Sequence, residues 1–141
     1  MMKVAGGWEV AVRTWRPLLG VLLVLASARC DSGPSAVADV ALGEEFTLAP
    51  GQSASAGPEA LTVQFARVVE DSRCPSDAQC IQAGQVVSEI ALSGSRSYLK
   101  PGDTVSSGGY RARLLGVLPY PSSASAIDPA QYRATLVVER R

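Results

Sequence analysis

The sequence predicts an all-β domain, an antiparallel β-sandwich or small barrel of about six to eight strands. Three observations support this fold class. Several segments alternate apolar and polar side chains, the period of a half-buried strand. Gly/Pro-rich turns separate these segments at intervals of roughly eight to twelve residues. Apart from a short apolar run near the amino terminus, no segment has a sustained helical period.

The first part of this domain is expected to contain two strands separated by a turn. A short strand at 46–48 leads into a turn rich in Ser, Ala and Gly at 52–58. Apolar and polar side chains then alternate over 61–66, which predicts a half-buried strand. Val68 and Val69 break this alternation and predict a bulge or bend.

The second part is expected to contain five further strands and to end near residue 138. The alternation returns after Gly84, and Gly, Pro and Asp residues mark the turns between strands. One helical turn near 76–81 is the only helix expected in the domain. The predicted strands are 86–92, 97–99, 104–107, 110–118 and 132–139.

The amino terminus has the pattern of a cleaved helical signal peptide over residues 1–29. Three basic residues, Lys3, Arg13 and Arg16, precede an apolar run at 17–26. This run is shorter than the roughly 20 residues that a membrane-spanning helix needs. We therefore expect export, a flexible tether at 30–40 and a single β domain at 41–141.

Two cleavage sites compete at the end of this segment. The small residues Ala26 and Ala28 fit ordinary signal peptidase, which would leave Arg29 as the new amino terminus. The sequence before Cys30 also resembles a lipobox, in which the cysteine thiol receives a lipid. If Cys74 and Cys80 pair with each other, Cys30 is left over, and this favours lipid attachment at Cys30. The sequence does not decide between the inner and the outer membrane as the site of the anchor.

Composition excludes several functions. The chain has no histidine, so neither a Ser-His-Asp site nor a tetrahedral Cys/His zinc site is available. From Asp31 onward there are nine Lys and Arg against twelve Asp and Glu, and no basic run that would bind nucleic acid. We expect a non-enzymatic protein without catalytic residues, metal or cofactor.

The stretch 70–85 contains two cysteines and the densest group of polar residues. Five residues separate Cys74 from Cys80, and Pro75 and Asp77 favour a tight turn between them. In an oxidising compartment the pair is expected to form a disulfide that contributes about 2 kcal/mol to stability. A thiol redox centre or a Cu(I)-binding pair is the alternative.

The same stretch carries a resemblance. The sequence Asp71-Ser72-Arg73-Cys74-Pro75, followed by Cys80-Ile81-Gln82-Ala83-Gly84, resembles a group of small bacterial envelope proteins with a DSRCP…CxxAG signature. Many members of that group are lipoproteins. The resemblance covers about twenty residues closely and the flanking strands loosely. It implies residence in the cell envelope and no particular reaction.

These observations lead to a hypothesis of a non-catalytic binding or structural domain of the envelope, lipid-anchored and facing the periplasm. The disulfide loop is its expected contact surface, and Arg73 can either project as an anchor for a partner or pair locally with Asp71 or Glu70. Arg111 and Arg113 form a second candidate patch. A soluble periplasmic or secreted inhibitor of an envelope enzyme is the alternative. The candidate partner-binding residues are Asp71, Arg73, Pro75 and Asp77.

Overall fold

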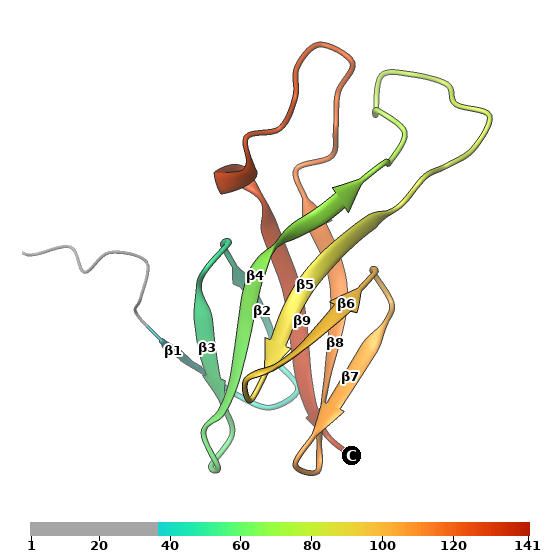
Figure 1. Ribbon diagram of the computed structural model, residues 1–141. Helices are drawn as coiled ribbons and strands as arrows, with labels where there is room; N and C mark the ends of the chain where they lie inside the picture. Colours follow the sequence, from blue (N-terminus) through green and yellow to red (C-terminus); the bar gives the residue numbers. More distant parts are fainter. Residues whose placement is uncertain (1–36) are drawn as a thin grey trace, which may run out of the picture. The chain divides into compact units, whose positions relative to one another are not determined.

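Two β-sheets make up residues 37–141, the part of the chain that the computed structural model describes (Figure 1). Sheet A has the strand order β1-β3-β4-β5-β6, and sheet B has the order β2-β9-β8-β7. All neighbouring strands are antiparallel except the pair β1 and β3. The nine strands are β1 (Ala38–Val40), β2 (Glu45–Leu48), β3 (Ser53–Ala56), β4 (Leu61–Asp71), β5 (Val86–Leu92), β6 (Ser95–Leu99), β7 (Thr104–Ser107), β8 (Tyr110–Leu118) and β9 (Arg133–Arg140).

The core lies between the two sheets and contains the apolar positions of the alternating segments. Phe65 of β4 and Ile90 and Leu92 of β5 come from sheet A, and Leu114 of β8 and Leu136 of β9 come from sheet B. All five side chains are fully buried. Burying a side chain of this size contributes about 1.5 to 3 kcal/mol relative to leaving it in water. The predicted all-β sandwich is confirmed.

The predicted irregularity in the long strand β4 is confirmed as well. The register between β4 and β5 shifts between Phe65 and Arg67 and again between Val68 and Glu70. Each bulge adds a residue on one strand, which bends it and increases its twist. The bulges lie in the half of β4 that leads into the cysteine loop.

One predicted turn is wrong. Within 52–58, residues Ser53–Ala56 form strand β3, which pairs with β4 from Ser53 opposite Gln64 to Ala56 opposite Leu61. Serine and alanine have little preference for strands by themselves. Ala54 and Ala56 are nevertheless fully buried, because their small side chains fit beneath the sheet. Tertiary packing therefore decides the structure of this segment.

The amino-terminal border of the domain also differs from the expectation. Residues Ala38–Val40 of the expected tether at 30–40 form strand β1, which pairs in parallel with β3. The ordered domain thus begins before residue 41. The predicted signal peptide at 1–29, the lipid-attachment residue Cys30 and the first part of the tether lie outside the described residues.

The predicted helical turn at 76–81 is wrong too. That segment has a turn in which the Ala78 amide donates to the Pro75 carbonyl at 3.1 Å, and no helix follows. A short 3-10 helix occurs instead at Pro129–Gln131, where the Asp128 carboxylate accepts a hydrogen bond from the Ala130 amide. This arrangement is an N-cap with proline in the first turn.

The two ends of the sandwich differ in their connections. Long loops at residues 72–85 and 119–132 leave the upper end in Figure 1, whereas short turns close the lower end. One of these short turns is Gly108 and Gly109, both with positive φ, as a two-residue hairpin between β7 and β8 requires. The loop end is therefore the more elaborate part of the domain.

Candidate functional site

The loop end holds the predicted disulfide. Cys74 and Cys80 are bonded, with their Cα atoms 5.9 Å apart. Below the bridge the two arms of the loop pair through backbone hydrogen bonds from Ser72 to Gln85 at 2.8 Å and from Cys74 to Ala83 at 3.0 Å. A disulfide is typical of an oxidising, exported compartment. Residues 76–85 are exposed, and among them Ile81 is a fully exposed large apolar residue.

Gly84 closes the base of this loop. Its φ is +64°, in the region that L side chains rarely adopt. A Cβ atom at this position would overlap the backbone carbonyl of Ser72. Glycine is therefore required both by the backbone conformation and by the close approach of the opposite arm.

The two long loops are joined to each other. The amide and the hydroxyl of Ser123 donate to the Asp77 carboxylate at 2.8 and 2.6 Å, and the Ser76 amide donates to the Pro121 carbonyl at 3.0 Å. The Ser123 hydrogen bonds lower the pKa of the Asp77 carboxyl below its usual value. The disulfide loop and the 119–132 loop thus form one surface.

Arg73 lies buried at the foot of these loops. Its side chain donates to the Asp71 carboxylate at 2.8 and 2.6 Å through Nε and Nη2. It also donates to the carbonyls of Val117 and Pro119 at 2.7 and 2.9 Å. Hydrogen bonding to Asp71 raises the pKa of Arg73. The guanidinium connects the loop after β4 to the end of β8 in the other sheet.

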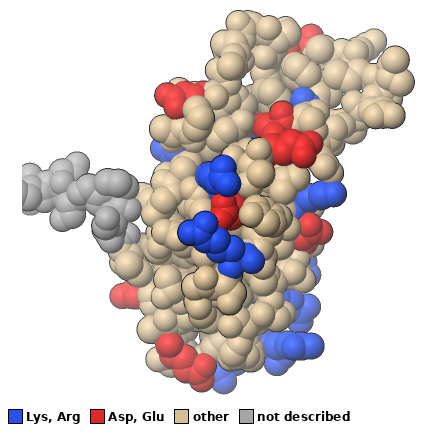
Figure 2. All heavy atoms as spheres, in the orientation of Figure 1, with Lys and Arg blue, Asp and Glu red and all other residues tan. Residues whose placement is uncertain are grey.

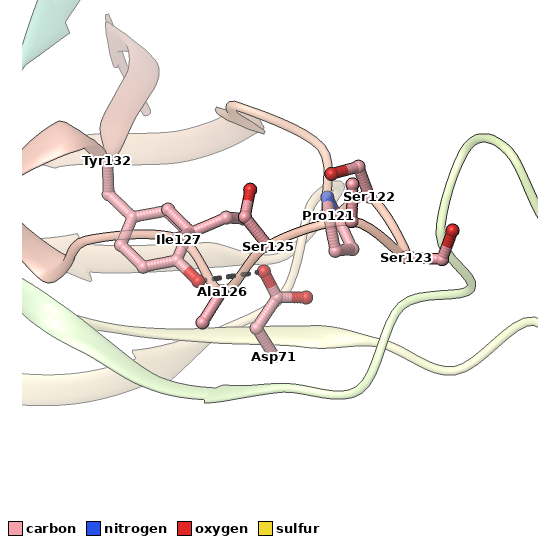
Figure 3. Close-up of a pocket in the computed structure, with 9 residues that line it drawn as sticks. Asp71, Pro121, Ser122, Ser123, Ser125, Ala126, Ile127 and Tyr132 are labelled. Atoms are coloured by element: carbon pink, nitrogen blue, oxygen red, sulfur yellow. Dashed lines mark hydrogen bonds between the residues drawn. The ribbon is translucent and has the colours of Figure 1, made fainter.

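Asp71 is shared between Arg73 and Tyr132. The Tyr132 hydroxyl donates to the Asp71 carboxylate at 3.0 Å, as the dashed line in Figure 3 shows. Burial by itself would raise the pKa of Asp71, but hydrogen bonds from Arg73 and Tyr132 outweigh burial and lower it. Burial and the hydrogen bond to Asp71 raise the pKa of Tyr132. We call Asp71, Arg73 and Tyr132 the buried network.

The buried network supports an exposed aromatic side chain. The guanidinium of Arg73 lies 4.4 Å from the centre of the Tyr120 ring, a cation-π contact. Tyr120 itself is 58 % exposed. The arginine is held by four oxygen acceptors, so the ring rests on a fixed support rather than on a mobile side chain.

An open hollow of about 570 Å³ is lined by Asp71, Tyr132 and residues 121–127. Figure 3 shows Tyr132 and Asp71 at one side of it and the serine-rich loop along the other. Hydroxyl groups of Ser122, Ser123 and Ser125 belong to this lining. The hollow offers hydrogen-bonding groups, and its one carboxylate is already paired with Arg73.

The structure decides between the two roles that the sequence left open for Arg73. It is only 9 % exposed, so it does not project as an anchor, and the local pairing with Asp71 is the alternative that the structure shows. Asp77 is exposed and bonded to Ser123, and Pro75 is half-buried beside it. Sequence reasoning missed Tyr120 and Tyr132 as parts of this site. The prolines on either side of Tyr120 indicate only that the strand at 110–118 ends there.

A second arginine–carboxylate cluster lies on the outer face of sheet A. Glu89 of β5 accepts hydrogen bonds from Arg67 of β4 and Arg96 of β6, each at 2.9 Å. Hydrogen bonding to Arg67 is the main reason why the pKa of Glu89 lies below its usual value. Figure 2 shows acidic and basic side chains interspersed on the face in view, which uncharged residues mostly cover. We call these three residues the surface trio.

Residues 37–141 contain neither a group of three potential metal ligands nor a helix long and apolar enough to cross a membrane. No protein-family model matches the chain, and neither a curated protein nor a solved structure shows significant similarity to it. Arg111 and Arg113 of the second candidate patch lie on β8, where Arg111 is half-buried and Arg113 exposed. The best-defined site is therefore the loop end.

Proposed function

We propose that this chain is a lipid-anchored, non-catalytic domain of the bacterial cell envelope that binds a protein partner through its loop end. The main support for this proposal is an exposed apolar residue, Ile81, on a loop closed by the Cys74–Cys80 disulfide. A loop held in one conformation loses less entropy when it binds.

The attachment of this loop to the rest of the domain supports the same proposal. Asp77 accepts hydrogen bonds from Ser123, and Arg73 donates to the carbonyls of Val117 and Pro119. The loop is therefore attached to the rest of the domain both at its base and between its two cysteines. A binding surface on such a loop does not have to be ordered by its partner. The resemblance of residues 71–84 to envelope lipoproteins supports the location.

Inhibition of an envelope enzyme is a second candidate, favoured by the shape of the same loop. Residues 77–85 extend beyond the sandwich in an exposed segment closed by a disulfide, a form that can enter the cleft of an enzyme (Figure 1). Inhibition is then one consequence of binding through the same surface.

The anchor is tested by the intact mass of the mature protein purified from membranes, before and after reduction and alkylation. We expect a diacylglycerol adduct on Cys30 and two thiols that appear only on reduction. A mass that begins at Arg29 and lacks lipid would contradict the anchored state and would indicate a soluble exported protein.

The binding surface is tested by crosslinking in cells. A photoreactive amino acid replaces Ile81 in one strain and Glu59, which is exposed in the β3–β4 turn at the opposite end, in another. We expect a discrete crosslinked product from position 81 only. Equal products from both positions, or none from position 81 at native expression, would refute binding through the loop end.

A further inference from the structure

The surface around Tyr120 contains three adjoining hollows. Two of them, of about 410 and 440 Å³, share Arg73, Val86, Pro101 and Tyr120 in their linings. A third, of about 580 Å³, shares Leu118 and Tyr120 with the first. We call this surface the Tyr120 groove and define it by Lys100, Pro101, Leu115, Leu118, Tyr120 and Arg133.

Apolar side chains stand exposed in the middle of this groove. Leu118 and Tyr120 are each 58 % exposed, two of the most exposed large apolar residues among those that the structure describes. Tyr120 is held against the guanidinium of Arg73, which is itself fixed by Asp71 and two carbonyls. An aromatic ring that is already positioned is the typical centre of a protein-binding hot spot.

The charged residues of the groove are basic. Lys100 belongs to one flanking hollow and Arg133 to the other, and neither forms a salt bridge with a described residue. The charge of Arg73 is balanced by Asp71. Asp103 accepts a hydrogen bond from the Lys100 amide but does not line the groove. Among residues 37–141, no Asp or Glu lines any of these three hollows.

We propose that the Tyr120 groove binds an extended segment of a protein partner in which acidic side chains flank apolar ones. Tyr120 lines all three hollows, which fit apolar side chains, and Lys100 and Arg133, each in the lining of a different hollow, bind the carboxylates. Charge complementarity of this kind selects the partner and fixes its register. This inference rests on the proposed function, since it names the chemistry of the partner that the loop end binds.

The groove is also continuous with the disulfide loop. Cys74, Ala83 and Gly84 line the same hollow as Lys100 and Tyr120. A partner that contacts Ile81 can therefore extend its chain along the base of the loop into the groove. The proposed segment and the exposed loop then belong to one interface.

The test uses a displayed library of random short peptides, selected on the full chain carrying Cys30→Ala so that no lipid interferes. We expect selected peptides to be enriched in Asp and Glu next to Leu, Val or Phe. A synthetic peptide of the enriched sequence should bind about tenfold more tightly than the same peptide with Asn and Gln in place of Asp and Glu.

Variants assign this binding to the groove. Tyr120→Ala should lower the affinity for the synthetic peptide about tenfold, as expected for a central anchor. The double variant Lys100→Glu, Arg133→Glu should select basic instead of acidic peptides. Arg141→Glu, a single charge reversal on an exposed residue at the opposite end, should leave selection and affinity unchanged.

Four outcomes would overturn the inference. Selection without acidic enrichment, or an acidic enrichment that persists in the double variant, would exclude recognition by Lys100 and Arg133. Binding of phosphatidylglycerol vesicles that the double variant loses, without any peptide preference, would make the groove a lipid-binding surface. Self-association abolished by Tyr120→Ala would make it a contact between copies. In each case crosslinks from position 81 to another protein would leave the proposed function intact.

Discussion

The buried network and the surface trio both join arginine to a carboxylate, but they do so in different surroundings. In the buried network the side chains of Arg73 and Asp71 are 7 % and 9 % exposed, and Arg73 donates both to Asp71 and to the carbonyls of Val117 and Pro119 at the end of β8. In the surface trio the Glu89 side chain is itself only 2 % exposed, but Arg67 and Arg96, which cover it, are 64 % and 72 % exposed. The same residue types therefore hold two sheets and two loops together in one place and cover a sheet face in the other.

The difference follows from the hydrogen-bond acceptors that each arginine contacts. Arg73 donates to the backbone carbonyls of Val117 and Pro119 at the end of β8, beyond the residues of β8 that pair with β7. Without it, buried acceptors and a buried carboxylate would lose their donors. Arg67 and Arg96 contact one side chain, and water can replace either of them.

The largest expected effect comes from removing the central arginine. Arg73→Ala should lower the free energy of unfolding by about 3 kcal/mol, because it leaves Asp71 buried without its cation. Chemical denaturation followed by far-ultraviolet circular dichroism measures this change. Arg67→Ala is the matched control and should have a much smaller effect. Equal losses in the two variants would contradict the distinction between the clusters.

The base of the disulfide loop gives the next largest effect. Gly84→Ala should destabilise the domain by about 2 kcal/mol, since the new methyl group meets the Ser72 carbonyl and the backbone has positive φ. Gly94→Ala, with φ +84° but open space around it, isolates the conformational cost and should lose about 1 kcal/mol. Thermal unfolding of both variants separates the cost of the overlap with Ser72 from the cost of the positive φ. A loss at Gly94 as large as that at Gly84 would show that the close approach is unimportant.

The smallest effect is on acid stability. Folding lowers the pKa of both Asp71 and Glu89, so their contributions are present above the unfolded pKa values and are lost as pH falls through the folded ones. The unfolding free energy should therefore decrease as pH falls below about 4. Glu89→Gln should make this decrease shallower without abolishing it, because Asp71 and Asp77, whose pKa values are also lowered, still titrate. Denaturation midpoints measured across this pH range test the expectation, and an unchanged slope in Glu89→Gln would contradict it.

Much of the fold could be predicted from the sequence because alternation is a local property. The strands around Phe65, Ile90, Leu114 and Leu136 were predicted because their apolar residues recur with period two. Strand β3 was not, since its alternation consists only of serine and alanine, which differ little in hydropathy. Strand β1 is three residues long and exists through its pairing with β3.

The candidate site divides in the same way. The sequence by itself determined the cysteine pair and the turn at Pro75, because covalent spacing and backbone preferences act between near neighbours. Only the tertiary structure decided that Arg73 is buried and that Tyr120 lies on it. Those contacts join residues more than forty positions apart, and their strength depends on burial and on carbonyls that the fold brings together. The sequence could not show whether an arginine beside a cysteine points outward to a partner or inward to the other sheet.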